Sequence, residues 1–224
     1  MVLWLRQFGV MRVSDFISFM HSNLDAAAVA TYQHLYLSFG SILLGMAVAI
    51  PLGIWLTDKE KLAEKVLGVT GIIQTVPGLA FLGLFLPLMG IGVAPSMTVL
   101  FLYSLLPILT NTYTGIKGVS PALVEAGMGM GMSPGQLLFM VKLPLAIPVI
   151  IAGIRIASVY IVSWATLAAF IGGGGLGDPI LTGIMTADIN FILMGAIPAA
   201  LLALTAGWIL GIVERLATPR GLRG

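Results

Sequence analysis

The sequence has 224 residues, of which 58% are hydrophobic and only 9% are charged, with a formal net charge of +2. Soluble chains carry roughly a quarter of their residues as Asp, Glu, Lys and Arg, so this composition excludes a soluble globular protein and indicates a chain that lies mainly in lipid. The absence of cysteine excludes disulfides and thiol chemistry, two histidines are too few for a histidine-rich metal site, and the scattered basic residues argue against nucleic acid as a partner.

Residues 1–34 differ from the rest because they mix apolar with polar and acidic side chains. Phe16, Met20 and Leu24 recur at helical spacing, which predicts a short amphipathic helix lying in the membrane interface. We do not expect a cleavable signal peptide, since no long apolar core followed by a small-residue cleavage site precedes the first predicted crossing.

Five later stretches are long and apolar enough to cross a hydrocarbon layer roughly 30 Å thick, which takes about 20 residues. They are residues 35–57, 66–89, 94–116, 147–171 and 191–213. Prolines within them predict kinks, and small residues such as Gly40, Gly45 and Ala49 predict close helix–helix contacts. The sequence therefore predicts an all-α membrane protein, with a five-helix domain over residues 35–213 and a basic tail over residues 214–224.

The basic residues predict the orientation of these crossings, because loops on the inner side of a membrane are rich in Lys and Arg. An outside N-terminus leaves only Arg6 and Arg12 outside. It places the other basic loop residues inside: Lys59, Lys61, Lys65, Lys117, Lys142, Arg215, Arg220 and Arg223. We therefore expect a multi-pass protein of the cell membrane with its N-terminus outside and its C-terminus inside.

The segment from residue 117 to residue 148 has no membrane to span. Ser-Pro pairs that begin at Ser120 and Ser133 are helix-start signals. They predict short helices over residues 121–128 and 134–142, joined by a glycine-rich bend, with Pro144 ending the second helix. Two such helices form a compact knob on the cytoplasmic face, and a knob of this kind must dock on something.

The knob carries the pattern of a known family. The positions that match are Glu125, Ala126, Gly131, Leu143 and Pro144. Their spacing resembles the Glu-Ala-Ala signature of binding-protein-dependent ABC importer permeases, with Gly127 in place of the usual second Ala and Val141 where Ile is usual. Five further segments resemble the osmoprotectant branch of that family, whose transporters import glycine betaine, carnitine or choline: residues 74–92, 106–119, 152–159, 168–184 and 189–204.

The resemblance implies a type I ABC importer permease core, with a coupling helix within residues 117–146 that fits a groove on a cytoplasmic ATPase dimer. It implies that the docking and coupling residues are Glu125, Ala126, Gly127, Gly131, Leu143 and Pro144. It also implies a second permease subunit, either another copy or a close homologue, and an extracytoplasmic solute-binding protein. We expect no cofactor on this chain, with ATP and magnesium on the partner ATPase.

Two other functions remain as alternatives. The first is a permease of an amino-acid importer, for example one for methionine, which has a similar length and the same number of crossings. The second belongs to a different class, the ion-coupled secondary transporters, which use an intramembrane carboxylate or an internal repeat. The predicted crossings lack Asp and Glu, which argues against that class. No nucleophile, base and orienting group occur together, so we do not expect the chain to be an enzyme.

Polar and aromatic residues inside the apolar runs are candidates for the translocation path. They are Gln74, Thr75, Tyr103, Asn111, Tyr160, Ser163, Trp164 and Thr166. Tyr160 and Trp164 share a helical face, and an aromatic face suits a quaternary ammonium ligand through cation–π attraction. Helix packing and hydrogen bonds between helices are the alternative roles for all of these residues.

Three further features have mainly structural explanations. Arg155 lies inside the fourth run, where we expect it to reach the interface or a carboxylate such as Glu125. The loop of residues 172–177 lacks the Lys-Ser/Thr of a phosphate loop. We expect it to form an outer turn, capped by Asp178 at the next helix. A gate or a contact for a binding protein is the alternative, functional role of this turn. Residues 59–64 resemble a solvated connecting turn.

Overall fold

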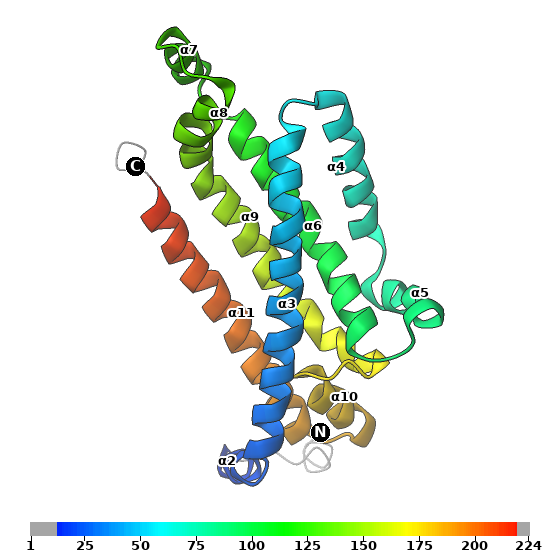
Figure 1. Ribbon diagram of the computed structural model, residues 1–224. Coiled ribbons are helices and arrows are strands. Elements are labelled where there is room, and N and C mark those ends of the chain that lie inside the picture. The colour runs from blue at the N-terminus through cyan, green and yellow to red at the C-terminus, as the bar shows by residue number, and fades with distance from the viewer. Residues whose placement is uncertain (1–12, 219–224) are drawn as a thin grey trace, which may run out of the picture.

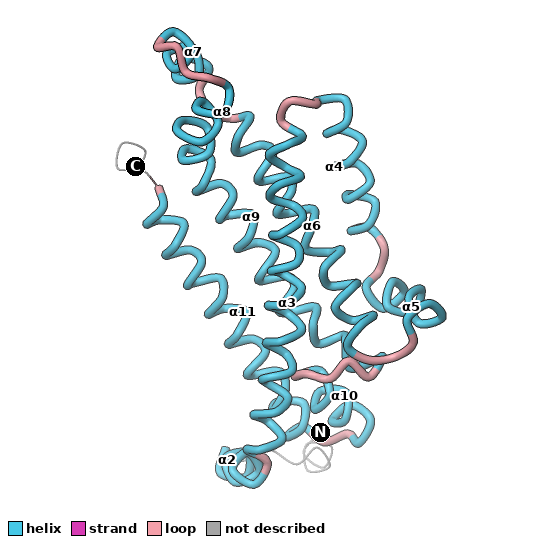
Figure 2. The backbone as a smooth tube through the Cα atoms, viewed as in Figure 1, coloured by secondary structure: helices cyan, strands magenta, loops and turns pink. Residues whose placement is uncertain are grey.

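The computed structural model describes residues 13–218, and within this range every regular element is a helix (Figures 1 and 2). The helices are α2 (Val13–Ser22), α3 (Leu24–Leu56), α4 (Glu60–Thr75), α5 (Gly78–Met89), α6 (Val93–Lys117), α7 (Pro121–Gly129), α8 (Pro134–Leu137), the π-helix η1 (Leu138–Lys142), α9 (Leu143–Trp164), the 3₁₀-helix η2 (Ala165–Ile171), α10 (Gly177–Thr186) and α11 (Ile189–Ala217). Arg6, Arg12, Arg220 and Arg223 lie outside the described residues.

Among the described residues, four helices are long and apolar enough to cross a membrane. They are α3, α6, the continuous helix of residues 134–171 that contains α9, and α11. The pair α4–α5 forms a fifth span if its two bent halves are counted together. The predicted all-α membrane fold is therefore confirmed, and the predicted second crossing is a broken one.

The first long helix begins earlier than predicted. α3 starts at Leu24 instead of residue 35, and its 33 residues correspond to roughly 50 Å of α-helix, more than a bilayer core requires. Of the predicted N-terminal segment, only α2 forms a separate short helix, which has no buried residue and is separated from α3 by Asn23. Its place in the membrane interface stays a prediction. Polar residues such as Gln33 and His34 thus extend the crossing helix beyond its apolar run.

The second predicted crossing is broken after α4. The axes of α4 and α5 differ by 99°. Val76 ends α4 in an extended conformation with φ −70° and ψ 128°, because a residue that precedes proline is driven away from the helical region. Pro77 therefore turns the chain sideways, and α5 lies at the side of the bundle, crosswise to the long helices, in Figure 1.

The long helices pack through small residues, as predicted. A Cβ on Gly53 of α3 would lie 2.8 Å from Thr112 of α6, and one on Gly153 of α9 would lie 2.8 Å from the Pro107 carbonyl oxygen of α6. Ala49 is completely buried in the same layer. Since lipid tails offer no hydrophobic drive between helices, such close backbone approach is what holds them together.

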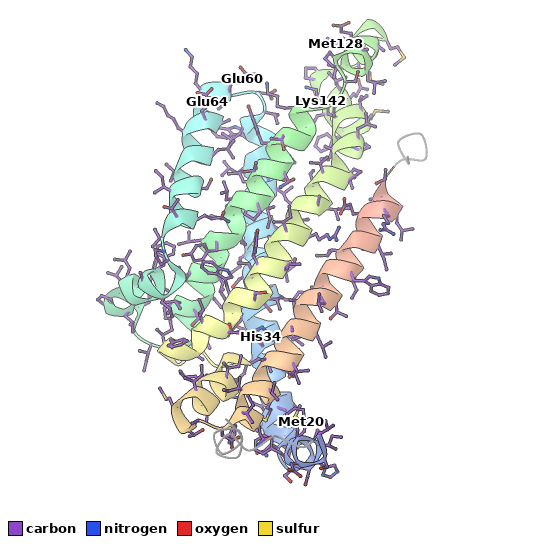
Figure 3. The ribbon with its side chains drawn as sticks, turned by 180° about the vertical axis from the view of Figure 1, so that it is seen from behind. Met20, His34, Glu60, Glu64, Met128 and Lys142 are labelled. Carbon is purple, nitrogen blue, oxygen red and sulfur yellow. The ribbon has the colours of Figure 1, made fainter. Side chains whose placement is uncertain are left out.

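The bundle has two distinct ends. The knob end carries the knob, residues 118–142, and the turn between α3 and α4, while the loop end carries α2, α10 and the loop of residues 172–176 (Figure 1). In Figure 3, Glu60, Met128 and Lys142 lie at the knob end and Met20 at the loop end, with His34 inside the bundle. The long helices α3, α6, α9 and α11 connect the two ends.

Candidate functional site

The knob turns at Gly131. The amide of Gly131 donates to the carbonyl of Met128 at 2.9 Å and the amide of Met132 to that of Gly127 at 3.1 Å. These two bonds form a Schellman motif, which needs a residue of positive φ. Gly131 provides it with φ 79°, so the predicted glycine bend is confirmed.

Gly127 is the buried residue of α7. A Cβ at this position would lie 2.7 Å from Cδ1 of Leu137 and 3.3 Å from Sδ of Met132. Both neighbours are the ends of flexible side chains. The glycine therefore lets α7 lie close against α8, while the side chains of Glu125 and Ala126 remain exposed on the outside of the knob.

The two predicted helix starts differ in detail. Ser133 forms a capping box, in which its hydroxyl accepts from the amide of Gln136 at 3.3 Å and its own amide donates to Oε1 of Gln136 at 2.8 Å. Ser120 precedes α7 as predicted, but its side chain makes no capping bond. Pro121 supplies the fixed φ that starts this helix.

Pro144 does not end the second knob helix, contrary to the prediction. Leu143 and Pro144 lie in the first turn of α9, which continues directly from α8 and η1. Proline removes an amide donor and crowds the preceding turn. The wider π-turn absorbs this defect, since the amide of Leu143 donates to the carbonyl of Leu138, five residues earlier. The knob is therefore attached to α9 by continuous helix.

Charged residues connect helices at the knob end. Nζ of Lys117, at the end of α6, lies 2.5 Å from Oε1 of Glu60, at the start of α4. Beside this pair is a cavity of about 320 Å³ lined in part by Asp58, Lys117, Glu125 and Lys142. Residues 60–64, predicted as part of a solvated connecting turn, thus belong to α4, and Glu60 makes a contact between helices that its sequence did not indicate.

Predicted path residues from α4, α6 and α9 line one cavity of about 160 Å³. Its lining residues are Gln74 of α4, Tyr103 of α6, and Tyr160, Ile161 and Trp164 of α9. Tyr103 is buried and Gln74 partly so, whereas Tyr160 is 56% exposed. The structure therefore brings together Gln74, Tyr103, Tyr160 and Trp164, and sequence reasoning missed Ile161.

Two hydrogen bonds link the α4 break to α6. Pro107 has no amide proton, so the carbonyl of Tyr103, four residues earlier, has no helical donor. Nε2 of Gln74 donates to that carbonyl at 3.1 Å. In return, the Tyr103 hydroxyl donates to the carbonyl of Val76 at 2.5 Å. Gln74 thus satisfies the Tyr103 carbonyl that Pro107 has freed, and Tyr103 satisfies the Val76 carbonyl that lies beside the break.

The remaining path candidates lie outside this cavity. Thr75 donates to Ile72, Ser163 to Val159 and Thr166 to Ser163, in each case to a carbonyl of the preceding turn. Asn111 donates to the Pro107 carbonyl at 2.8 Å and contacts the close-packed Gly153. These side chains bond to nearby carbonyls three or four residues earlier along the chain, and not across helices as the alternative role had predicted.

Arg155 pairs with Glu214 of α11 and not with Glu125. The distance from Nη1 to Oε2 is 3.4 Å, and a Cβ on Gly211 would lie 3.3 Å from the guanidinium. The structural role predicted for Arg155 is therefore confirmed with a different partner. No local sequence signal identifies Glu214, because the two residues lie on different helices.

At the loop end, a glycine turn contacts α3. Gly172, Gly174 and Gly175 have φ values of 69°, 82° and 92°, which other residues rarely adopt. The amide of Gly175 donates to Oε1 of Gln33 at 3.1 Å. The predicted turn is thus confirmed, and it is bonded to the part of α3 that extends beyond the predicted crossing.

Asp178 does not cap α10, because Leu176 occupies the capping position and Asp178 lies within the first turn. Its carboxylate lies in a groove shared with Asp25 of α3 and Phe191 of α11. Desolvation there raises the pKa of Asp178 above its ordinary value. An acidic residue in the first helical turn is still favourable for the helix dipole.

Residues 49–220 match the family described as "Binding-protein-dependent transport system inner membrane component". The chain is 46% identical to the glycine betaine/carnitine/choline transport system permease protein OpuCB of Bacillus subtilis, over 95% of this chain and 98% of that protein. It is also 46% identical to the choline transport system permease protein OpuBB of B. subtilis, over 92% and 95%. Its fold resembles a chain of the MetNI methionine ABC transporter in an inward facing conformation, with a TM-score of 0.77, 20% identity, and coverage of 86% and 96%.

Proposed function

The chain belongs to the binding-protein-dependent transport system inner membrane components, and from this membership we propose that it is the permease subunit of an ATP-driven importer for quaternary ammonium osmoprotectants. It is a multi-pass membrane protein and not an enzyme. Glycine betaine, carnitine and choline are the solutes named for OpuCB, and we assign the same class to this chain. ATP and magnesium then bind to a partner ATPase, which supplies the energy.

The main observation that supports the coupling mechanism is the exposure of Glu125 and Ala126 on the knob. In this proposal, Glu125 and Ala126 contact the ATPase dimer, Gly127 and Gly131 shape the knob, and Leu143 and Pro144 join it to α9. Since α8, η1 and α9 are one continuous helix, movement of the knob reaches the transmembrane bundle without a flexible linker. A rigid element of this kind suits a rocking transition between two states.

The proposed orientation places the knob end in the cytoplasm. Lys117, Lys142 and the lysines of the α3–α4 turn and the start of α4 belong to that end, whereas Asp25 and Asp178 belong to the loop end. This distribution supports the orientation, because positive loops stay inside. The loop end would then meet the solute-binding protein. A second permease subunit, either a copy or a homologue, would complete the path.

The orientation can be tested by labelling single introduced cysteines, because the chain has no cysteine of its own. Single cysteines at Met128 in the knob and at Met185 in α10 are both exposed positions. We expect a membrane-impermeant maleimide added to intact cells to label Met185→Cys only. Labelling of Met128→Cys from outside would reverse the proposed topology.

Transport is tested with the permease, its ATPase and its binding protein reconstituted in liposomes. We expect ATP-dependent uptake of radiolabelled glycine betaine or choline, competed by carnitine and not by methionine. An ATPase-dead partner should abolish uptake, whereas a protonophore should not. Competition by methionine alone would instead support the amino-acid importer, and loss of uptake with the protonophore alone would support an ion-driven transporter.

A further inference from the structure

The cavity of about 160 Å³ lies beside the break between α4 and α5. Gln74 comes just before that break, at the end of α4, and the other lining residues come from α6 and α9. Non-helical backbone at membrane depth is tolerated where protein buries it or where it borders a water-filled cavity. The cavity therefore borders the non-helical backbone of the break.

The aromatic walls of this cavity are held in place by neighbouring groups. The rings of Tyr103 and Trp164 lie with centroids 4.5 Å apart and planes inclined by 56°. Tyr103 is further held by Phe81, at 5.5 Å between centroids, and by its bond to Val76. Trp164 packs on Gly78, where a Cβ would lie 2.6 Å from the indole. Rings fixed in advance lose little entropy when a ligand arrives.

The chemistry of the lining selects one kind of ligand. Two tyrosines and a tryptophan face the cavity, and none of its lining residues is charged. Aromatic rings attract cations, and a quaternary ammonium has no N–H group that needs a hydrogen-bond acceptor. Without a carboxylate nearby the attraction remains weak, which suits a site that must release its ligand. A cavity of about 150 Å³ accommodates a molecule of the size of benzene, and a trimethylammonium group is no larger.

We propose that the cavity lined by Gln74, Tyr103, Tyr160 and Trp164 is a transient binding site for the trimethylammonium group of the transported solute. The inference rests on the proposed function, because it assigns a site to the same solute. Nε2 of Gln74 uses one of its two N–H bonds for the Tyr103 carbonyl, so the other can meet a polar group of the solute. Tyr160, which is 56% exposed, forms the open side through which the solute enters.

The test uses the complete transporter in liposomes or detergent, with choline and glycine betaine as probes. Tyr160→Leu removes an aromatic ring from an exposed position, whereas Tyr160→Phe removes only the hydroxyl. Trp164→Leu removes the second ring. Trp208→Leu is the matched control, because Trp208 is 67% exposed on α11 and does not line the cavity. Binding to the complex without its binding protein is followed by saturation-transfer NMR of the methyl signal, and uptake is measured in parallel.

We expect Tyr160→Leu and Trp164→Leu to weaken choline binding by roughly 2- to 30-fold, the range of a single cation–π contact, and to slow uptake. Trp208→Leu should behave as wild type, and Tyr160→Phe, which keeps the ring, should weaken binding less than Tyr160→Leu does. The neutral choline analogue with carbon in place of nitrogen should bind more weakly than choline, because it lacks the charge.

Two results overturn different claims. Wild-type binding and uptake in both leucine variants would overturn the cavity assignment and leave the proposed function standing. Absence of quaternary ammonium uptake in the wild-type transporter would overturn the proposed function itself. If Trp164→Leu does not assemble, the comparison of Tyr160→Leu with Tyr160→Phe tests the cavity assignment. Tyr160 is exposed, so its truncation leaves the packing intact.

Discussion

Arg155 and Glu214 form an ion pair that joins α9 to α11, with 3.4 Å between Nη1 and Oε2. α9 is the helix that continues from the knob, so this pair connects the proposed coupling element to the last crossing. An unpaired arginine within an apolar helix is costly. Pairing with Glu214 and contact with Gly211 explain how Arg155 is accommodated.

The Arg155–Glu214 pair should contribute modestly to stability. Its side chains are 48% and 30% exposed, so we expect a coupling of at most about 1 kcal/mol, reduced by salt. Thermal unfolding of Arg155→Ala, Glu214→Ala and the double variant in detergent measures this coupling as a double-mutant cycle. Strictly additive losses at low salt would show that the pair contributes nothing.

Glu125→Lys should prevent association with the ATPase, because it reverses the charge on the exposed face of the knob. Glu64→Lys makes the same change in net charge on an exposed residue of α4 and serves as the control. Co-purification of the ATPase with each variant, after the fold is verified by its thermal unfolding, provides the measurement. Equal recovery of ATPase with both variants would remove Glu125 from the docking surface.

Gly127 should tolerate alanine but not a large residue. A Cβ there meets only the flexible end of Leu137 at 2.7 Å and Met132 at 3.3 Å, and alanine favours helix by about 1 kcal/mol over glycine. Gly127→Phe must separate α7 from α8 and should lower ATPase association and uptake. Gly129→Phe, at a position with no atom within 4 Å of the added Cβ, is the control. Equal activity of the two phenylalanine variants would contradict the packing explanation.

Gly177→Ala should strongly destabilise the loop end. A Cβ at Gly177 would lie 2.7 Å from the carbonyl carbon of Thr166 and 2.9 Å from the Cβ of Ala169. These are backbone and short side-chain atoms, which cannot move aside cheaply, so we expect a loss of about 1–3 kcal/mol. Gly71→Ala is the control, because nothing lies near its added Cβ. The midpoint of thermal unfolding measures both, and an unchanged midpoint for Gly177→Ala would refute the close contact.

Asp178 should make stability depend on pH. Desolvation raises its pKa above the ordinary value of 3.8, so the folded protein holds this proton more tightly than the unfolded chain. The contribution of the carboxyl group to folding is therefore fully present below pH 3.8 and is lost as pH rises through the raised pKa. Asp178→Asn should raise the unfolding temperature at pH 7, and the gain should shrink toward pH 4. Asp58→Asn, at an exposed position of the knob end, is the control and should not raise the unfolding temperature at pH 7. An increase equal to that of Asp178→Asn would exclude desolvation of Asp178 as the cause.

The amino-acid sequence predicts the helices, because a backbone in lipid must satisfy its amides within each helix and an apolar run of sufficient length then indicates a crossing. It also determined the knob, since helix starts at Pro121 and Pro134 and the bend at Gly131 depend on local backbone geometry. A proline did not have one fixed effect, however: Pro77 broke a crossing, whereas the π-turn carried the helix past Pro144.

Which side chains meet could not be predicted from local sequence. Glu214 as the partner of Arg155, and the meeting of Gln74, Tyr103 and Trp164 around one cavity, depend on the rotation and depth of separate helices. Those quantities are set by contacts such as Gly53 against Thr112, between residues far apart along the chain. Hydropathy reports whether a segment enters lipid but carries no information about which face turns toward which neighbour.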